Sequence, residues 1–256
     1  MNEVDELLGT ENNQKDYHQS NKEKWEKQNR QRNEAYKKMD DMSLKIVKDG
    51  TVFQQYLDIM SKFEKYSVGN CLLILEANPN AIQIKEKQDW IDRGYSLVDN
   101  ANKIIILEPN KVGERVYYNP KEEYDISQTN APAFEKRNFT IREMMLAMVD
   151  ICKKENIERG IVDVLPNGNK GSEYVEKEKR LYMCKGLKQE YLFKTVAQEI
   201  ARMQMKVLEH SEMNEFKTFC ISYMICKKYG LDTAQFDFSN LPKDLVNKSK
   251  GKEIRE

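Results

Sequence analysis

The chain has 256 residues, of which 39% are hydrophobic and 33% are charged. This length is enough for one large domain or two small ones. Its 42 basic and 42 acidic residues give a formal net charge of +0, so any contact with nucleic acid must come from a local basic patch. The five cysteines lack paired spacing, and neither a signal peptide nor an apolar run of roughly 20 residues is found. These features predict a cytoplasmic protein with free thiols and no membrane partner.

The N-terminal part is charged and divides into two segments. Residues 1–20 are polar and acid-rich with little periodicity, so we expect them to be disordered. Residues 21–44 alternate in charge and predict an exposed helix. Trp25 and Tyr36 lie on one face of it and are expected to anchor it to the protein body or to a partner. Alternatively, this helix presents basic side chains to DNA, namely Arg30, Arg32, Lys37 and Lys38.

A first domain is expected over residues 45–130. A capping-box pattern at Thr51–Gln54 opens a helix whose apolar side chains recur at helical spacing: Phe53, Tyr56, Leu57, Met60 and Phe63. A nearly all-apolar second helix follows at residues 71–77 and ends at Asn78 and Pro79. Strands are expected further along the chain, at residues 104–109, 115–118 and 124–126.

Several short motifs follow one another in this domain: FEKYSVGN at 63–70, then Leu72–Ile74, Pro79–Ala81, Trp90, Gly94 and Ile104–Pro109. In this order they resemble the N-terminal domain of ArdC-type antirestriction proteins, which are found on plasmids and conjugative elements. The similarity continues through residues 124–129 and extends over most of residues 45–240. The resemblance implies an α+β fold and binding of single-stranded DNA.

Binding of single strands needs aromatic surfaces for bases and cations for phosphates. The candidates are the aromatics Tyr66, Trp90 and Tyr95, the cations Lys62, Lys65, Lys85, Lys87, Arg93 and Lys103, and the amides Asn70 and Gln83. Trp90 has the alternative of a buried anchor, and each lysine has the alternative of a solvated surface residue. The chain also departs from the family, with Tyr95 and Val98–Asn100 where basic residues are common.

The second domain is expected over residues 131–240, after a Pro-containing linker at 130–134. Its expected elements are a helix opened by a capping box at Thr140–Glu143, a buried strand at 161–165, a hairpin at 172–184, a helix at 187–210 and a last helix at 212–229 closed by Gly230. Residues 241–256 are expected to form a flexible tail.

The resemblance implies a metallopeptidase-like, zincin-type second domain, with a His-Glu-x-x-His motif whose histidines hold zinc and whose glutamate acts as base. This chain has Gln198, Glu199 and Arg202 at the matching positions, and Phe219 stands where a third ligand is expected. Arginine has no lone pair to offer a metal. We therefore expect no metal, no cofactor and no peptidase activity, with the vestigial Glu199 paired to Arg202 at i, i+3 spacing.

Another metal site is also not expected, because the spacing of the remaining ligand types does not support one: Cys184, Cys220, Cys226 and His210. Two functions remain. The chain either coats single-stranded DNA of a mobile element, in antirestriction or protection during transfer, or acts as a protein-interaction adaptor through the inactive peptidase-like groove. In the first case, five lysines should converge on one face: Lys62, Lys65, Lys85, Lys87 and Lys103. A true peptidase ranks third.

Overall fold

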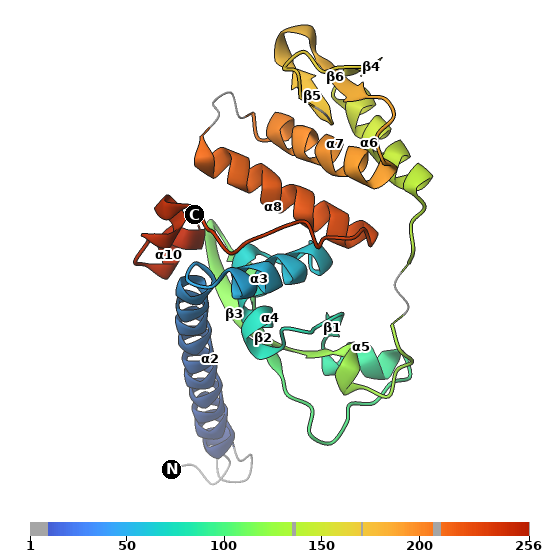
Figure 1. The fold of residues 1–256 in the computed structure, drawn as a ribbon. Coiled ribbons are helices and arrows are strands. Elements are labelled where there is room, and N and C mark those ends of the chain that lie inside the picture. Colours follow the sequence, from blue (N-terminus) through green and yellow to red (C-terminus); the bar gives the residue numbers. More distant parts are fainter. Residues whose placement is uncertain (1–9, 135–136, 170, 207–210, 256) are drawn as a thin grey trace.

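The computed structural model describes residues 10–134, 137–169, 171–206 and 211–255, with the side chains described from residue 22 onward. The chain has the predicted α+β fold (Figure 1). The first half contains α2 (Thr10–Ile46), α3 (Gly50–Lys62), α4 (Val68–Ala77), β1 (Ile84–Lys85), α5 (Lys87–Asp92), β2 (Ile104–Val112) and β3 (Arg115–Asp125). The second half contains α6 (Ile141–Lys154), β4 (Glu158–Val162), β5 (Ser172–Val175), β6 (Arg180–Cys184), α7 (Gln189–Gln204), α8 (Glu212–Tyr229), α9 (Lys243–Val246) and α10 (Gly251–Arg255). None of the helices in these described ranges is both long and apolar enough to cross a membrane.

Helix α2 begins at Thr10, inside the segment that was expected to be disordered, while residues 1–9 of that segment lie outside the described ranges. Its packing face also differs from the prediction. Trp25 and Tyr36 are 62% and 39% exposed, so the prediction that they anchor the helix to the body was wrong. Ala35 and Met39, one helical turn apart, are buried against α4 and β2 instead, because their small and flexible side chains allow close approach.

Helix α3 has its N-cap two residues before the predicted capping box. Its N-cap is Asp49, whose carboxylate accepts hydrogen bonds from the N–H groups of Thr51 (2.8 Å) and Val52 (3.3 Å). The box predicted at Thr51–Gln54 is therefore wrong, although the predicted apolar face of this helix packs into the core. The next helix, α4, is capped by Ser67, and its apolar segment 71–75 is buried, as its composition predicted.

The described residues form two small sheets of three strands each. In the first, of order β1-β3-β2, both pairings are antiparallel, and the two strands predicted at 115–118 and 124–126 are one continuous strand. In the second, of order β4-β6-β5, β4 runs parallel to β6, and β5 and β6 form the predicted hairpin. The prediction of a buried strand at 161–165 was wrong: Ile161 is 74% exposed because β4 is an edge strand, and only Leu165 is buried.

One hydrophobic core joins the two halves of the chain. Helix α8 packs against both α7 and α3 (Figure 1), and the Phe216 ring lies 5.4 Å from that of Phe53 on α3. Phe238 also contacts Phe53, with ring centroids 5.8 Å apart. The boundary expected near residue 130 therefore does not separate two independent cores.

The last residues of the chain contact its first helix. The segment 241–256 was expected to be flexible, but its described part forms α9 and α10, and α10 packs on α2. Arg255 binds the Asp40 carboxylate at 2.6 Å and the Ser43 hydroxyl at 3.2 Å. Leu245 and Ile254 also pack against the core, so the attachment combines polar and apolar contacts.

Candidate nucleic-acid interface

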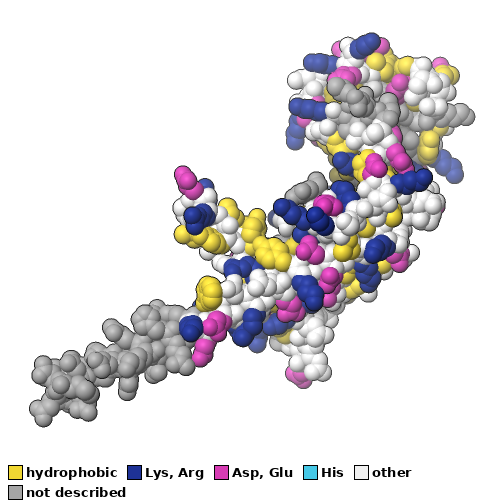
Figure 2. Space-filling model, turned by 90° about the vertical axis from the view of Figure 1, so that its left-hand side faces the viewer, with side chains coloured by type: hydrophobic (Ala, Val, Ile, Leu, Met, Phe, Trp, Pro, Cys, Tyr) yellow, Lys and Arg dark blue, Asp and Glu magenta, His cyan; other side chains and the backbone are white. Residues whose placement is uncertain are grey.

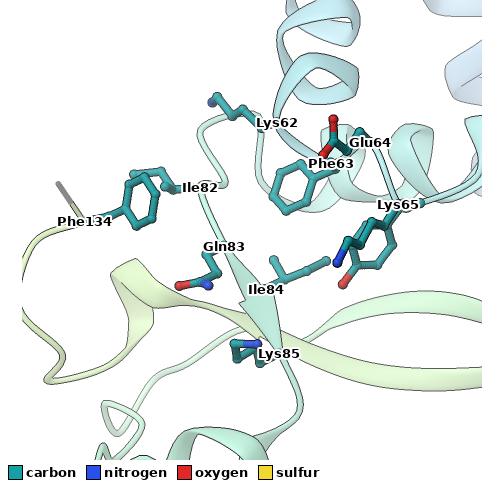
Figure 3. Close-up of a pocket in the computed structure, with 10 residues that line it drawn as sticks. Lys62, Phe63, Glu64, Lys65, Ile82, Gln83, Ile84, Lys85 and Phe134 are labelled. Carbon is teal, nitrogen blue, oxygen red and sulfur yellow. The ribbon is translucent and has the colours of Figure 1, made fainter. Parts of the chain in front are cut away.

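Five of the predicted site residues line one pocket between the end of α3 and β1 (Figure 3): Lys62, Lys65, Tyr66, Gln83 and Lys85. The remaining lining residues are Phe63, Glu64, Ile82, Ile84 and Phe134. The pocket has a volume of about 340 Å³. Residues 62–66 and 82–85 are thus two walls that the fold brings together, and we call the space between them the α3–β1 pocket.

The first wall is the turn that follows α3. Lys62 donates a hydrogen bond from Nζ to the carbonyl oxygen of Ala81 at 3.1 Å, which links this wall to the segment leading into β1. The hydroxyl of Tyr66 donates to Oε2 of Glu123 at 2.8 Å. Burial, and then this hydrogen bond, raise the pKa of Tyr66 above its ordinary value. The phenol therefore stays protonated and fixes the ring at the edge of the pocket.

The second wall is held in place by a buried carboxylate. Asp125 is fully buried, and its Oδ1 accepts hydrogen bonds from the N–H groups of Ile82 (2.7 Å) and Gln83 (2.9 Å). Its Oδ2 accepts from the backbone N–H (3.1 Å) and hydroxyl (2.6 Å) of Ser127. Along the strand, Ile84 is buried, whereas Gln83 and Lys85 are half-buried on the other face. The polar side chains of this wall are thereby directed away from the core.

An aromatic side chain that the sequence did not predict completes the pocket. Phe134 is 48% exposed and lies beside Ile82, which is 40% exposed (Figure 3). The sequence pattern placed Phe134 in a linker. The sequence signal for its place at the pocket is that it is a single aromatic residue in a polar, Pro-containing stretch. A ring exposed at the mouth of a basic pocket is a surface on which a base can stack.

The only acidic residue that lines this pocket in the described part of the chain is Glu64. It forms an ion pair with Lys228 of α8, and the hydrogen bond from that lysine lowers the pKa of Glu64. Lys65 and Lys85 therefore face a pocket in which the one carboxylate already has a cation beside it. Elsewhere, Figure 2 shows Lys and Arg interspersed with Asp and Glu, as expected for a chain without net charge.

Two predicted site residues are structural instead. Trp90 is 2% exposed and donates its indole N–H to the carbonyl oxygen of Tyr124 at 2.9 Å, so it is the buried anchor and not a stacking platform. Asn70 is 7% exposed, and its amide accepts from the N–H of Leu107 (2.8 Å) and donates to the same residue's carbonyl (3.0 Å). Neither side chain has an exposed polar group for DNA. Tyr95 is half-buried, with its ring 6.4 Å from that of Trp90.

Three predicted cations lie outside the lining of the α3–β1 pocket. Lys87 and Arg93 are exposed at the two ends of α5. Lys103 forms an ion pair with Glu122 at 2.7 Å and lines a different pocket, against α2. The predicted convergence of five lysines is therefore found for three of them. Lys103 is not among these three, because it lies just before β2 and lines the pocket against α2.

The second predicted site, around Glu199, is occupied by an ion-pair network. Glu199 is 9% exposed and accepts a hydrogen bond from the N–H of Tyr174 at 3.1 Å. Its predicted ion pair with Arg202 is confirmed, and Arg202 also binds Glu215 of α8 at 2.7 Å. Burial would lower the pKa of Arg202, but the two carboxylates together raise it.

Phe219, the residue predicted to stand at the position of a third ligand, packs against other aromatic rings and not against this network. Its ring packs 4.9 Å from that of Phe236 and 5.3 Å from that of Phe238. The side chain that α8 directs toward Arg202 is one turn earlier, at Glu215.

No family model and no curated protein matches the chain. Among solved structures, it is similar to the antirestriction protein ArdC of plasmid R388. The Mn(II)-bound crystal structure has 12% sequence identity and a TM-score of 0.43, and the similarity covers 66% of this chain and 71% of that one. The metal-free crystal structure has 11% sequence identity and a TM-score of 0.41, and the similarity covers 66% of this chain and 72% of that one.

The residues around Glu199 do not fit a metal ion. In the described ranges there is no group of three or more His, Cys, Asp or Glu side chains arranged to hold one. The Arg202 guanidinium lies between the two carboxylates, Glu199 and Glu215, and supplies the positive charge there. The pocket that described residues form beside Glu199 has a volume of about 0 Å³.

Proposed function

We propose that this chain binds single-stranded DNA in the α3–β1 pocket and serves a mobile genetic element, in antirestriction or in protection of DNA during transfer. The observation that supports the proposal is the grouping of Lys62, Lys65 and Lys85 with Tyr66 and Phe134 around one pocket. The mobile-element context follows from the ArdC-type motifs of the sequence. The second half of the chain has no catalytic role in this proposal.

The physical basis is a combination of phosphate neutralisation and base stacking. An unpaired base exposes its π face and can stack on the ring of Phe134, whereas a base inside a duplex is already stacked on its neighbours. Lys65 and Lys85 then lie close enough to the same pocket to meet the flanking phosphates. Because the whole chain has no net charge, binding should be moderate, and its salt dependence should reflect only the few phosphate contacts of the pocket lysines.

The test is fluorescence anisotropy with labelled single-stranded and double-stranded oligonucleotides across a salt series. The double variant Lys65→Ala/Lys85→Ala should reduce the salt slope by about 1.4, because each lost phosphate contact on a single strand removes about 0.7. A matched control is Lys111→Ala/Lys177→Ala, which removes the same charge from exposed positions outside the pocket. An equal effect of both double variants would contradict a local site.

The stacking part of the proposal has its own variants. Phe134→Ala should cost about 1–3 kcal/mol of single-strand affinity, while Phe134→Tyr should bind normally because it keeps the aromatic face. Tyr36→Ala removes another exposed ring, outside the pocket, and serves as the control. Absence of binding at low salt would refute the proposal as a whole.

The alternative function, a protein-interaction adaptor that uses the peptidase-like groove, requires open space beside Glu199. Arg202 already engages the carboxylates of Glu199 and Glu215, so a protein partner would have to break these ion pairs to use them. This geometry favours the DNA-binding proposal.

A further inference from the structure

A second and larger cavity, of about 440 Å³, lies on the other side of α3. Residues of α3, α8 and α10 line it; α3 and α8 pack against each other, and α10 packs on α2 (Figure 1). Most of its lining is apolar, including Phe53, Leu57, Met60, Phe216, Met224 and Ile254. The volume lies in the range of small-molecule sites, and an apolar cavity holds ordered water poorly. The flexible thioethers allow the wall to adapt to the shape of a ligand.

The charged residues among the described lining of this cavity are all cations: Lys217, Lys248 and Arg255. Two of them already have partners in the fold. Arg255 binds Asp40 and Ser43, and Lys248 donates to the backbone carbonyl of Glu253. Lys217 is exposed and makes no ion pair or hydrogen bond with other described residues. A ligand in this cavity therefore meets an apolar wall with one cation available beside it.

From this arrangement we propose that the cavity binds a long-chain monocarboxylate, with its alkyl chain among the methionines and phenylalanines and its carboxylate beside Lys217. The alkyl chain gains from burial in proportion to the apolar area removed from water. The carboxylate gains a charge-assisted contact that a neutral head group would lack. The site shares none of its lining residues with the α3–β1 pocket, so the two proposals are independent.

Binding is tested by isothermal titration calorimetry of the full-length protein with dodecanoate, below its critical micelle concentration. Dodecanol and butyrate are the comparison ligands, since each lacks one of the two required features. We expect saturable binding of one dodecanoate, binding of dodecanol about three- to tenfold weaker, and no measurable binding of butyrate.

Two variants locate the ligand. Lys217→Glu should weaken dodecanoate binding by about tenfold or more and leave dodecanol binding unchanged, while Lys177→Glu, on the distant sheet, should change neither. Met224→Trp fills the cavity and should abolish binding of both amphiphiles, with the thermal unfolding midpoint recorded to establish that the variant is folded. No saturable binding, or equal binding by folded Met224→Trp, would overturn the proposal.

Discussion

The Oδ1 atom of Asp125 accepts a hydrogen bond from the backbone N–H of Gln83 at 2.9 Å. The same atom accepts from the adjacent Ile82, and the other carboxylate oxygen is used by Ser127. A fully buried carboxylate at the end of β3 therefore positions the β1 wall of the α3–β1 pocket. Because these contacts are made to backbone groups, they hold the wall independently of the side chains that line it.

Replacement of Asp125 by Asn should destabilise the protein. The amide oxygen can still accept from Ile82 and Gln83, but the amide NH₂ would face the N–H donor of Ser127. A buried polar group left without a partner costs about 1–3 kcal/mol. Urea unfolding measures the cost, and Ser127→Ala is the control, because it removes one hydroxyl contact and leaves both bonds to the β1 wall. An unchanged free energy of unfolding for Asp125→Asn would show that the carboxylate is not needed.

The pKa of Glu123 predicts a pH dependence of stability. Burial raises this pKa above its ordinary value of 4.5, against the opposing effects of the Tyr66 hydrogen bond and of Lys121. The protonated form is thus favoured in the folded protein, and the stability it contributes is lost as pH rises from 4.5 through the raised pKa. Glu123→Gln stays neutral and still accepts from Tyr66. It should therefore be more stable than the wild type at neutral pH, with a difference that grows across this window.

The neighbouring Glu122 provides a control of opposite sign. The hydrogen bond from Lys103 lowers its pKa, so its ionised form contributes stability at neutral pH that is lost as pH falls through the lowered pKa. Glu122→Gln should be slightly less stable than the wild type at neutral pH, with a small effect because the pair is largely exposed. Free energies of unfolding between pH 4 and 8, about the range in which carboxyl groups with raised pKa titrate, test both signs. The same sign for both variants would contradict this account.

Trp90 should matter for folding and not for DNA contact. Trp90→Phe loses the hydrogen bond to the Tyr124 carbonyl and should cost about 1–3 kcal/mol, whereas Trp90→Ala also leaves a cavity and should cost about 3–5 kcal/mol. The affinity of folded Trp90→Phe for single strands should equal that of the wild type. A stable Trp90→Phe protein with greatly weakened DNA binding would place the indole in the interface after all.

Local signals in the sequence predicted most of the second half correctly. The capping box at Thr140 and Glu143 is formed, and Gly230 ends α8 with a positive φ of 79°. Both features depend on residues a few positions apart, so the pattern and the geometry agree. Of the three pocket lysines, Lys65 lies within the motif at 63–70, whereas Lys62 and Lys85 lie outside the motifs.

Long-range packing could not be read from the same patterns. Nothing near Phe216 or Phe238 indicates that their rings meet Phe53, more than 150 residues away in the sequence. Phe134 lay in a stretch without periodicity, so its place at the pocket was equally hidden. For Trp90, the sequence left burial and stacking open, because both uses favour a large ring, and only the hydrogen bond to Tyr124 distinguishes them.

The Arg202 network predicts how a metal site can be introduced. Positions 198 and 202 are one turn apart on α7, and Arg202 contacts Glu215 of α8. The positive charge of Arg202 therefore opposes binding of a metal cation between Glu199 and Glu215. In the double variant Gln198→His/Arg202→His, two imidazoles and the Glu215 carboxylate should bind one Zn(II) or Co(II), since these are ligands that both metals accept.

Visible absorption of the Co(II)-loaded double variant measures this metal binding directly. The wild type and the single variant Gln198→His should show no such spectrum, because the Arg202 guanidinium remains between the carboxylates. Without metal, the double variant should lose about 1.5–3 kcal/mol of stability, since Glu199 and Glu215 lose a charged hydrogen-bond donor, and metal should restore it. Adding Glu215→Gln to the double variant should weaken binding. Equal metal binding with and without that substitution would show that α8 supplies no ligand here.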